Sequence, residues 1–230
     1  MLDVQRKELK YLVDISEMTR LKIALGQVMI KDIHNGVNGY RVRSLYFDTL
    51  GDSDFEEKVD GYDKRQKIRM RIYDNAEIIK LELKAKESDM QRKYSLLLSR
   101  KEAENMMHAD YGFLLERPEK IAHSIYIKLM TNCYRPKCIV EYDRLAFLKD
   151  TNDTRVTFDM NLRASESNLN LLDENLILYP VCSLGEITME VKYNSFLFSY
   201  IKQMINRTDK SQISNSKYCR ARKISKKGRF

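Results

Sequence analysis

The chain has 230 residues, of which 43% are hydrophobic and 32% are charged. That apolar content is enough for a sizeable core, and it excludes a chain that is disordered throughout. The formal net charge of +8 at pH 7 favours a polyanionic partner without identifying it, because a positive field concentrates phosphates near a protein surface.

The first predicted elements are a short strand and a helix. Glu8 and Lys10 flank Leu9 near the start of the chain, an alternation that is typical of a strand with one charged face. A helix is predicted after Asp14, because Glu17 follows at the spacing of a capping box and an apolar face comes next.

Two strands with a charged face come next. In KIRMRIY, over residues 67–73, Arg69 and Arg71 share one face and the apolar residues share the other. KLELKAK, over residues 80–86, repeats this split, and its charged face consists of Lys80, Glu82, Lys84 and Lys86. Solvent-facing strands usually include Thr, Ser and Gln, so faces built almost entirely from Lys, Arg and Glu are unusual.

Three further helices are predicted, and we expect them to cover the sheet. Ser99 and Glu102 repeat the capping-box spacing before an apolar stretch. Apolar residues recur with the helical period over residues 119–130 and 195–206.

The last two predicted strands show the same alternation. In RVTFD, Arg155 and Asp159 lie opposite the apolar residues, and in ITMEVK, Glu190 and Lys192 do so. No Gly, Ser or Pro-rich linker divides the sequence, which favours a single domain. The stretch from residue 220 to the end is strongly basic.

An ordinary antiparallel sheet with one face in water would produce the same alternation. Like charges on neighbouring strands would then repel one another. A closed barrel resolves this conflict if its lumen binds a multivalent anion and helices cover its apolar outside. For the same reason, Arg69→Ala should weaken binding of that anion and spare the fold.

Several site classes find no support. The four cysteines show no paired C-x-x-C spacing and the three histidines are far apart, which argues against a structural zinc site. No apolar stretch approaches the ~18 residues of a membrane-spanning helix, and the first residues lack an apolar signal segment. We therefore expect a cytoplasmic protein with no transmembrane segment of its own. The sequence identifies no membrane partner.

Eight segments between residues 6 and 218 together resemble the vacuolar transporter chaperone (VTC) domain, within the triphosphate tunnel metalloenzyme superfamily. They are RKELKYLV, YRVRSLYFDT, KIRMRIYD, LELKAK, EYDRLAF, RVTFD, MEVKYN and SKY. The resemblance implies an α+β fold, a closed antiparallel eight-stranded β-tunnel with a basic lumen and with helices outside and at the ends. We expect this domain over residues 1–219 and a basic C-terminal tail over residues 220–230.

Site residues follow from the resemblance together with the charged strand faces. The expected catalytic cations are Lys10, Arg69, Arg71, Lys84, Arg144, Arg155 and Lys192. Like Arg69→Ala, Arg144→Ala should weaken substrate binding and spare the fold, and stability without ligand should rise slightly because clustered cations repel one another. The expected substrate-binding residues are Lys86, Tyr142, Ser216 and Lys217.

The resemblance also implies a manganese or magnesium ion, held by Glu190 with Glu82 and Glu8 as helpers. Tunnel enzymes often begin with Glu-x-Glu-x-Lys, whereas Arg6 occupies the first Glu position here. That difference makes a two-metal hydrolytic site at this strand less favoured than a single ion on Glu190.

The leading hypothesis is an ATP-dependent polyphosphate polymerase that transfers the γ-phosphate to a growing chain. The main alternative is a metal-dependent triphosphatase acting on inorganic triphosphate, a nucleotide or an RNA 5′ triphosphate. The second alternative is a non-catalytic module that binds polyphosphate. The sequence has no recognition-helix, zinc-finger or ribonucleoprotein signature, which argues against sequence-specific nucleic-acid binding. The expected partners are ATP or another triphosphate, and polyphosphate.

Overall fold

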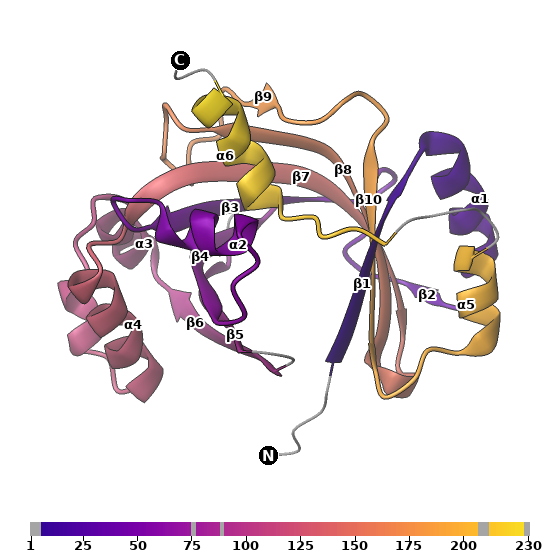
Figure 1. Cartoon of the computed structure of the whole chain (residues 1–230), viewed down its shortest axis with the longest axis horizontal. Helices are drawn as coiled ribbons and strands as arrows, with labels where there is room; N and C mark the ends of the chain where they lie inside the picture. Colours follow the sequence, from indigo (N-terminus) through magenta and orange to yellow (C-terminus); the bar gives the residue numbers. More distant parts are fainter. Residues whose placement is uncertain (1–5, 75–76, 88–89, 207–211, 228–230) are drawn as a thin grey trace. The chain divides into compact units, whose positions relative to one another are not determined.

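The computed structural model describes residues 6–74, 77–87, 90–206 and 212–227 (Figure 1). The strands are β1 (Arg6–Val13), β2 (Ile30–Lys31), β3 (Tyr40–Asp48), β4 (Arg65–Tyr73), β5 (Ile79–Glu87), β6 (Met90–Leu98), β7 (Arg135–Lys149), β8 (Thr154–Ser165), β9 (Tyr179–Pro180) and β10 (Ile187–Asn194). The helices are α1 (Ile15–Leu25), α2 (Ser53–Val59), α3 (Arg100–Met107), α4 (Lys120–Thr131), α5 (Ser199–Asn206) and α6 (Lys217–Lys227), with short 3₁₀ turns η1 (Gly112–Leu115) and η2 (Thr151–Asp153).

Eight of the strands form one continuous path in the order β1-β10-β8-β7-β3-β4-β5-β6, and the two-residue strands β2 and β9 pair with β7 and β8. Every pairing for which a register is defined is antiparallel. This confirms the expected α+β fold with an eight-stranded antiparallel sheet. Among the described residues no pairing joins β1 to β6, so closure of the tunnel stays a prediction.

The contacts divide the chain into two compact units, each assembled from separated segments. Unit 1 consists of Met1–Arg41, Tyr142–Leu162 and Cys182–Ser216. Unit 2 consists of Val42–Glu141, Arg163–Val181 and Lys217–Phe230. Neither unit is a continuous stretch of sequence, and the expected domain boundary at residue 219 stays a prediction.

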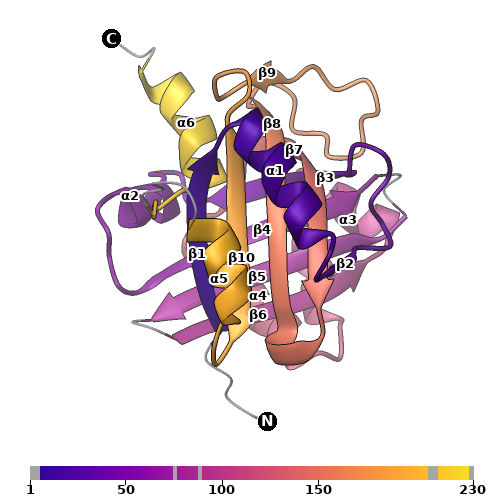
Figure 2. The ribbon, with the colours of Figure 1, turned by 90° about the vertical axis from the view of Figure 1, so that its right-hand side faces the viewer.

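Unit 1 has a core between its strands and two helices. Alternate residues of β8 and β10, including Phe158, Met189 and Val191, are fully buried together with Leu21 of α1 and Ile201 of α5. Figure 2 shows α1 and α5 on the same face of β8 and β10, with α1 above α5 in this view. The apolar halves of these strands therefore face the helices, as their alternation predicts.

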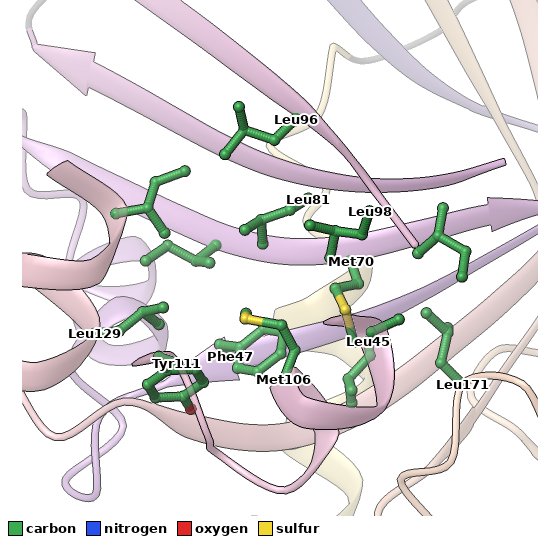
Figure 3. Close-up of a cluster of buried hydrophobic side chains, with 14 of the residues drawn as sticks. Leu45, Phe47, Met70, Leu81, Leu96, Leu98, Met106, Tyr111, Leu129 and Leu171 are labelled. Atoms are coloured by element: carbon green, nitrogen blue, oxygen red, sulfur yellow. The ribbon is translucent and has the colours of Figure 1, made fainter. Parts of the chain in front are cut away.

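Unit 2 has a second core, drawn in Figure 3. Met70 of β4 and Leu81 of β5 are fully buried and pack with Met106 of α3 and Leu129 of α4. Leu171, from the loop before β9, joins the same cluster. The apolar face of KIRMRIY and KLELKAK is thus the core face, which leaves their charged residues on the opposite face.

The helix starts follow their capping residues. Asp14 accepts a hydrogen bond from the backbone N–H of Glu17 at 2.7 Å, and both halves of the capping box are present. The second capping box, at Ser99 before α3, is also present. The last predicted helix begins at Ser199 rather than at residue 195, because Ser195 has a φ of 59° and the left-handed conformation cannot continue into a right-handed helix.

Part of the expected basic tail is helical. Its described part, residues 220–227, belongs to helix α6. Arg222 of this helix is buried and its guanidinium contacts Asp52 at 2.7 Å and Glu166 at 2.6 Å. Residues 228–230 lie outside the described residues. None of the helices in the described part of the chain combines the length and apolar character needed to cross a bilayer.

Candidate phosphate and metal site

The register of β1 and β10 brings opposite charges together in unit 1. Lys10 lies directly opposite Glu190, and Glu8 lies opposite Lys192. Residues opposite each other on two strands share a face and are close enough to interact. We call these four side chains the charge ring.

Each lysine of the charge ring contacts both carboxylates. The ammonium nitrogen of Lys10 lies 3.1 Å from Glu8 Oε1 and 3.3 Å from Glu190 Oε1. The ammonium nitrogen of Lys192 lies 3.1 Å from Glu190 Oε2 and 3.8 Å from Glu8 Oε1. The ring therefore alternates in sign, and the two carboxylates are held together by two shared cations.

Arg144 of β7 borders the charge ring. Its guanidinium donates two hydrogen bonds of 2.7 Å to the two oxygens of Asp159 and lies 3.9 Å from Glu190 Oε2. Its charged end also lies 5.2 Å from the ring centroid of Tyr142. Burial alone would lower the pKa of Arg144, but Asp159, Tyr142 and Glu190 raise it well above its usual value. The guanidinium is thus fixed in place and always charged.

The segment before α6 reaches the same ring. Lys10 donates a 3.1 Å hydrogen bond to the backbone carbonyl of Asn215, whose side chain in turn donates to Thr188 at 2.8 Å. Ser216 follows directly and is partly buried. This contact brings the expected substrate-binding serine to the strand pair that carries the ring.

Arg155 lies on the neighbouring strand, opposite Lys192. Its guanidinium donates to the Tyr40 hydroxyl at 2.7 Å and contacts Asp32 Oδ2 at 3.3 Å. Its partners therefore differ from those of the charge ring.

Unit 2 has a charged face of its own, made of residues from β3 to β6. Arg69 Nε donates to Glu82 Oε2 at 2.7 Å, and Lys93 forms an ion pair with the other oxygen of Glu82. Burial alone would raise the pKa of Glu82, but the charges of Arg69, Arg71 and Lys93 lower it to about 2. Glu82 is thus ionised and already held by cations.

Each of the two arginines of β4 donates a hydrogen bond to a hydroxyl group of β3. Arg71 donates to the hydroxyl of Ser44 at 3.0 Å, and Arg69 donates to the hydroxyl of Tyr46 at 3.1 Å. Tyr46 stacks on Tyr218 of α6 with 5.0 Å between ring centroids. Burial alone would raise the pKa of Tyr46, but Arg69, Arg71 and Lys67 lower it to about 8.

Lysines line up across the strands of unit 2. Lys84 lies opposite Lys67 on β4 and opposite Lys93 on β6. Like charges directly opposite each other destabilise a sheet, and an anion bound among them would offset this repulsion. Lys86 lies opposite Arg65, and Lys217 is the first residue of α6.

Several of these charges are largely shielded from solvent. The exposed fraction is 1% for Glu82, 5% for Glu190 and 7% for Arg144. An ordinary sheet with a solvated polar face would leave such groups in water. Burial of ions is costly unless they are paired or bind a ligand, and each of these three groups has at least one partner of opposite charge.

Sequence reasoning missed two residues as members of the site. Asp159 appeared in the alternation of RVTFD, but its role as the bidentate partner of Arg144 depends on contacts between strands. Lys93 lies in QRKYSLLL, which has no clear period of two, so only the register with β5 places it beside Glu82 and Lys84.

The donor set decides which metal the site can hold. Among the described residues there is no group of three or more His, Cys, Asp or Glu side chains arranged to hold a metal ion. Glu8 and Glu190, joined through their shared lysines, supply two carboxylates. Magnesium-like cations commonly use one or two protein carboxylates and complete their shell with water and substrate phosphates. The residues of the charge ring fit such an ion, with Glu82 held elsewhere by Arg69 and Lys93.

Comparisons with other proteins bear on the family and the fold. A family model described as VTC domain matches residues 5–226. A proposed adenylate cyclase from Bacillus halodurans superposes with a TM-score of 0.53 at 14% identity, covering 92% of this chain and 95% of the other. The proposed adenylyl cyclase HpAC1 from Hippeastrum, described with a dominant triphosphatase activity, gives a TM-score of 0.55 at 11% identity and covers 94% of each chain. No curated protein sequence matches this chain.

Proposed function

Because the chain belongs to the VTC domain family, and so to the triphosphate tunnel fold, we propose that it is an ATP-dependent polyphosphate polymerase. The observation that carries the proposal is the charge ring with the buried guanidinium of Arg144 3.9 Å from Glu190. This arrangement combines carboxylates suited to a hard cation with cations suited to phosphates.

The proposed reaction is a phosphoryl transfer. An oxygen of the terminal phosphate of the growing chain attacks the γ-phosphorus of ATP and forms a new P–O–P bond. The bond between the γ-phosphorus and the bridging oxygen breaks, and ADP leaves with that oxygen and its electron pair. The chain grows by one phosphate, and no protein nucleophile is needed, because such reactions depend mainly on positioning and charge stabilisation.

Arginine and lysine have separate proposed roles. Arg144 and Arg69 present planar guanidinium groups that bond two phosphate oxygens at once and stay charged at any working pH. Lys10 and Lys192 are flexible point charges that can follow a phosphate as it moves. The lysines of β4 to β6 would bind phosphate on the charged face of unit 2, since their mutual repulsion falls when an anion lies among them.

The proposed metal is Mn²⁺ or Mg²⁺, held by Glu190 and Glu8. When bound, such an ion neutralises charge on the phosphates and stabilises the charge that develops during transfer. Glu190 contacts Lys10, Lys192 and Arg144, so an ion held by its carboxylate would lie beside the cations proposed to bind phosphate. Participation of Glu82 stays a prediction.

A metal-dependent triphosphatase is the second candidate. It is favoured by the triphosphatase activity described for the Hippeastrum protein of similar fold. The same residues would then hold the triphosphate while water replaces the terminal phosphate as the attacking group. A polyphosphate-binding module without turnover is the third candidate, and the buried carboxylate of Glu190 disfavours it, because an anion binder gains nothing from a negative charge at its site.

The products made from ATP separate these candidates. Purified protein is incubated with γ-labelled ATP and Mn²⁺, with a metal-free reaction as control, and the products are resolved by size. A polymerase produces labelled chains that lengthen with time, together with ADP. Free labelled phosphate without chains would exclude the polymerase and support the triphosphatase. Unchanged ATP would exclude both enzymes and support the binding module.

A further inference from the structure

The two carboxylates that fit a metal ion are occupied by the protein's own ammonium groups. Lys10 contacts Oε1 of Glu8 and Oε1 of Glu190, and Lys192 contacts Oε2 of Glu190 and, at 3.8 Å, Oε1 of Glu8. Both oxygens of Glu190 and Oε1 of Glu8 are therefore in ion pairs with these lysines. A divalent cation that binds both carboxylates must compete for the same oxygens.

The lysines are better placed to move than the carboxylates. Their side chains are 24% and 26% exposed, whereas the side chain of Glu190 is 6% exposed and that of Glu8 is 14% exposed. A lysine ammonium sits on a flexible four-carbon stem and makes no fixed fork of hydrogen bonds. Arg144, by contrast, is fixed by its two hydrogen bonds to Asp159. The arginine can keep its position while the lysines change partner.

Charge balance gives this movement a direction. Two carboxylates and two ammonium groups sum to zero net charge in the ring. Adding a dication alone creates an excess of two positive charges, which makes metal binding unfavourable by itself. Adding a phosphate chain with the metal restores balance, because the displaced ammonium groups gain phosphate oxygens as new partners.

We propose that Lys10 and Lys192 substitute for the divalent cation in the metal-free protein and transfer from Glu8 and Glu190 to phosphate when metal and substrate bind together. This inference rests on the site of the proposed function. Metal and polyphosphate then bind with positive coupling. By linkage, each raises the affinity for the other by the same factor.

The test measures binding without turnover. Calorimetry determines the affinity of Mn²⁺ alone, of tripolyphosphate alone, and of Mn²⁺ in the presence of tripolyphosphate. The proteins compared are wild type, Lys10→Met, Lys192→Met and the double variant. Lys7→Met is the matched control, because Lys7 is on the same strand as Lys10 but lines a separate surface pocket with Leu9 and Tyr11. Thermal unfolding tests whether each variant is folded. If the double variant does not fold, the Mn²⁺ affinities of the two single variants test the inference.

We expect Mn²⁺ alone to bind Lys10→Met and Lys192→Met more tightly than wild type, by about fivefold or more. The coupling with tripolyphosphate should be smaller in the double variant than in wild type, since only direct bridging by the metal remains. Lys7→Met should match wild type in both quantities. Equal Mn²⁺ affinity in all of these proteins would overturn the inference, and so would an equal gain in Lys7→Met, which would show a general charge effect.

This outcome is independent of the proposed activity. If the coupling between Mn²⁺ and tripolyphosphate depends on the lysines but the protein does not turn over ATP, the exchange of the lysines between carboxylate and phosphate is supported and the polymerase hypothesis is excluded. If the wild-type protein forms polymer normally, and Mn²⁺ binds wild type and both lysine variants with the same affinity, the exchange is excluded and the polymerase is retained.

Discussion

Glu190→Gln should lower turnover of ATP with Mn²⁺ by a factor on the order of hundreds. A hard cation needs a charged carboxylate, and glutamine keeps the size and shape of the side chain while removing that charge. Without metal, tripolyphosphate should bind the variant as tightly as wild type or more tightly. The reason is that Lys10, Lys192 and Arg144 lose an anionic partner and become more available to phosphate.

Turnover should fall while metal-free binding is retained or strengthened, which separates catalysis from binding. Turnover is measured by product formation from ATP and Mn²⁺, and metal-free affinity for tripolyphosphate is measured by calorimetry. Glu186→Gln makes the same chemical change just before β10 and should retain wild-type turnover. Wild-type turnover in Glu190→Gln would remove this residue from the mechanism and favour the binding module.

Arg144→Ala should destabilise the protein by about 3–5 kcal/mol, because removal of one partner from a buried ion pair leaves the other charge without compensation. The side chain of Asp159 is 1% exposed and that of Arg144 is 9% exposed, and two hydrogen bonds of 2.7 Å join them. This revises the expectation from sequence that Arg144→Ala spares the fold. Repulsion among cations predicted a gain in stability, but the structure pairs this cation with a buried carboxylate.

Urea unfolding of the single and double variants tests the pair. Arg144→Ala with Asp159→Ala should regain part of the lost free energy of unfolding, because no uncompensated charge stays buried. Both variants should bind tripolyphosphate more weakly than wild type. A loss below about 1 kcal/mol in Arg144→Ala would show that the pair contributes no more than an exposed ion pair.

The strand faces were predictable from sequence because a period of two reports directly which residues share a side. Met70 and Leu81 are fully buried, and Arg69 and Glu82 lie on the other face, as the alternation indicates. The capping boxes at Asp14 and Ser99 were predictable for a similar reason, since their partners are three residues away.

Long-range pairing was not predictable in the same way. The alternation of RVTFD places Asp159 on the charged face, but it does not say that Arg144 is its partner. Lys93 depends on the register of β5 and β6, which is set by cross-strand contacts rather than by its own neighbours in sequence. The contact of Lys10 with the carbonyl of Asn215 joins residues 205 positions apart, and no local pattern records it.

Affinity as a function of phosphate chain length tests most directly whether the charged faces bind a phosphate chain. Phosphate, pyrophosphate, tripolyphosphate and a longer polyphosphate are titrated into the wild-type protein under identical salt, and the shift in thermal unfolding is recorded for each. A ligand that binds only the folded state stabilises it by an amount that rises with the logarithm of the ligand concentration divided by Kd, so at equal concentration a tighter ligand gives a larger shift. The account predicts that affinity and thermal shift rise with each added phosphate up to tripolyphosphate. Equal shifts for phosphate and tripolyphosphate would contradict it, because they would show a generic anion site and leave the buried charges as structural ion pairs.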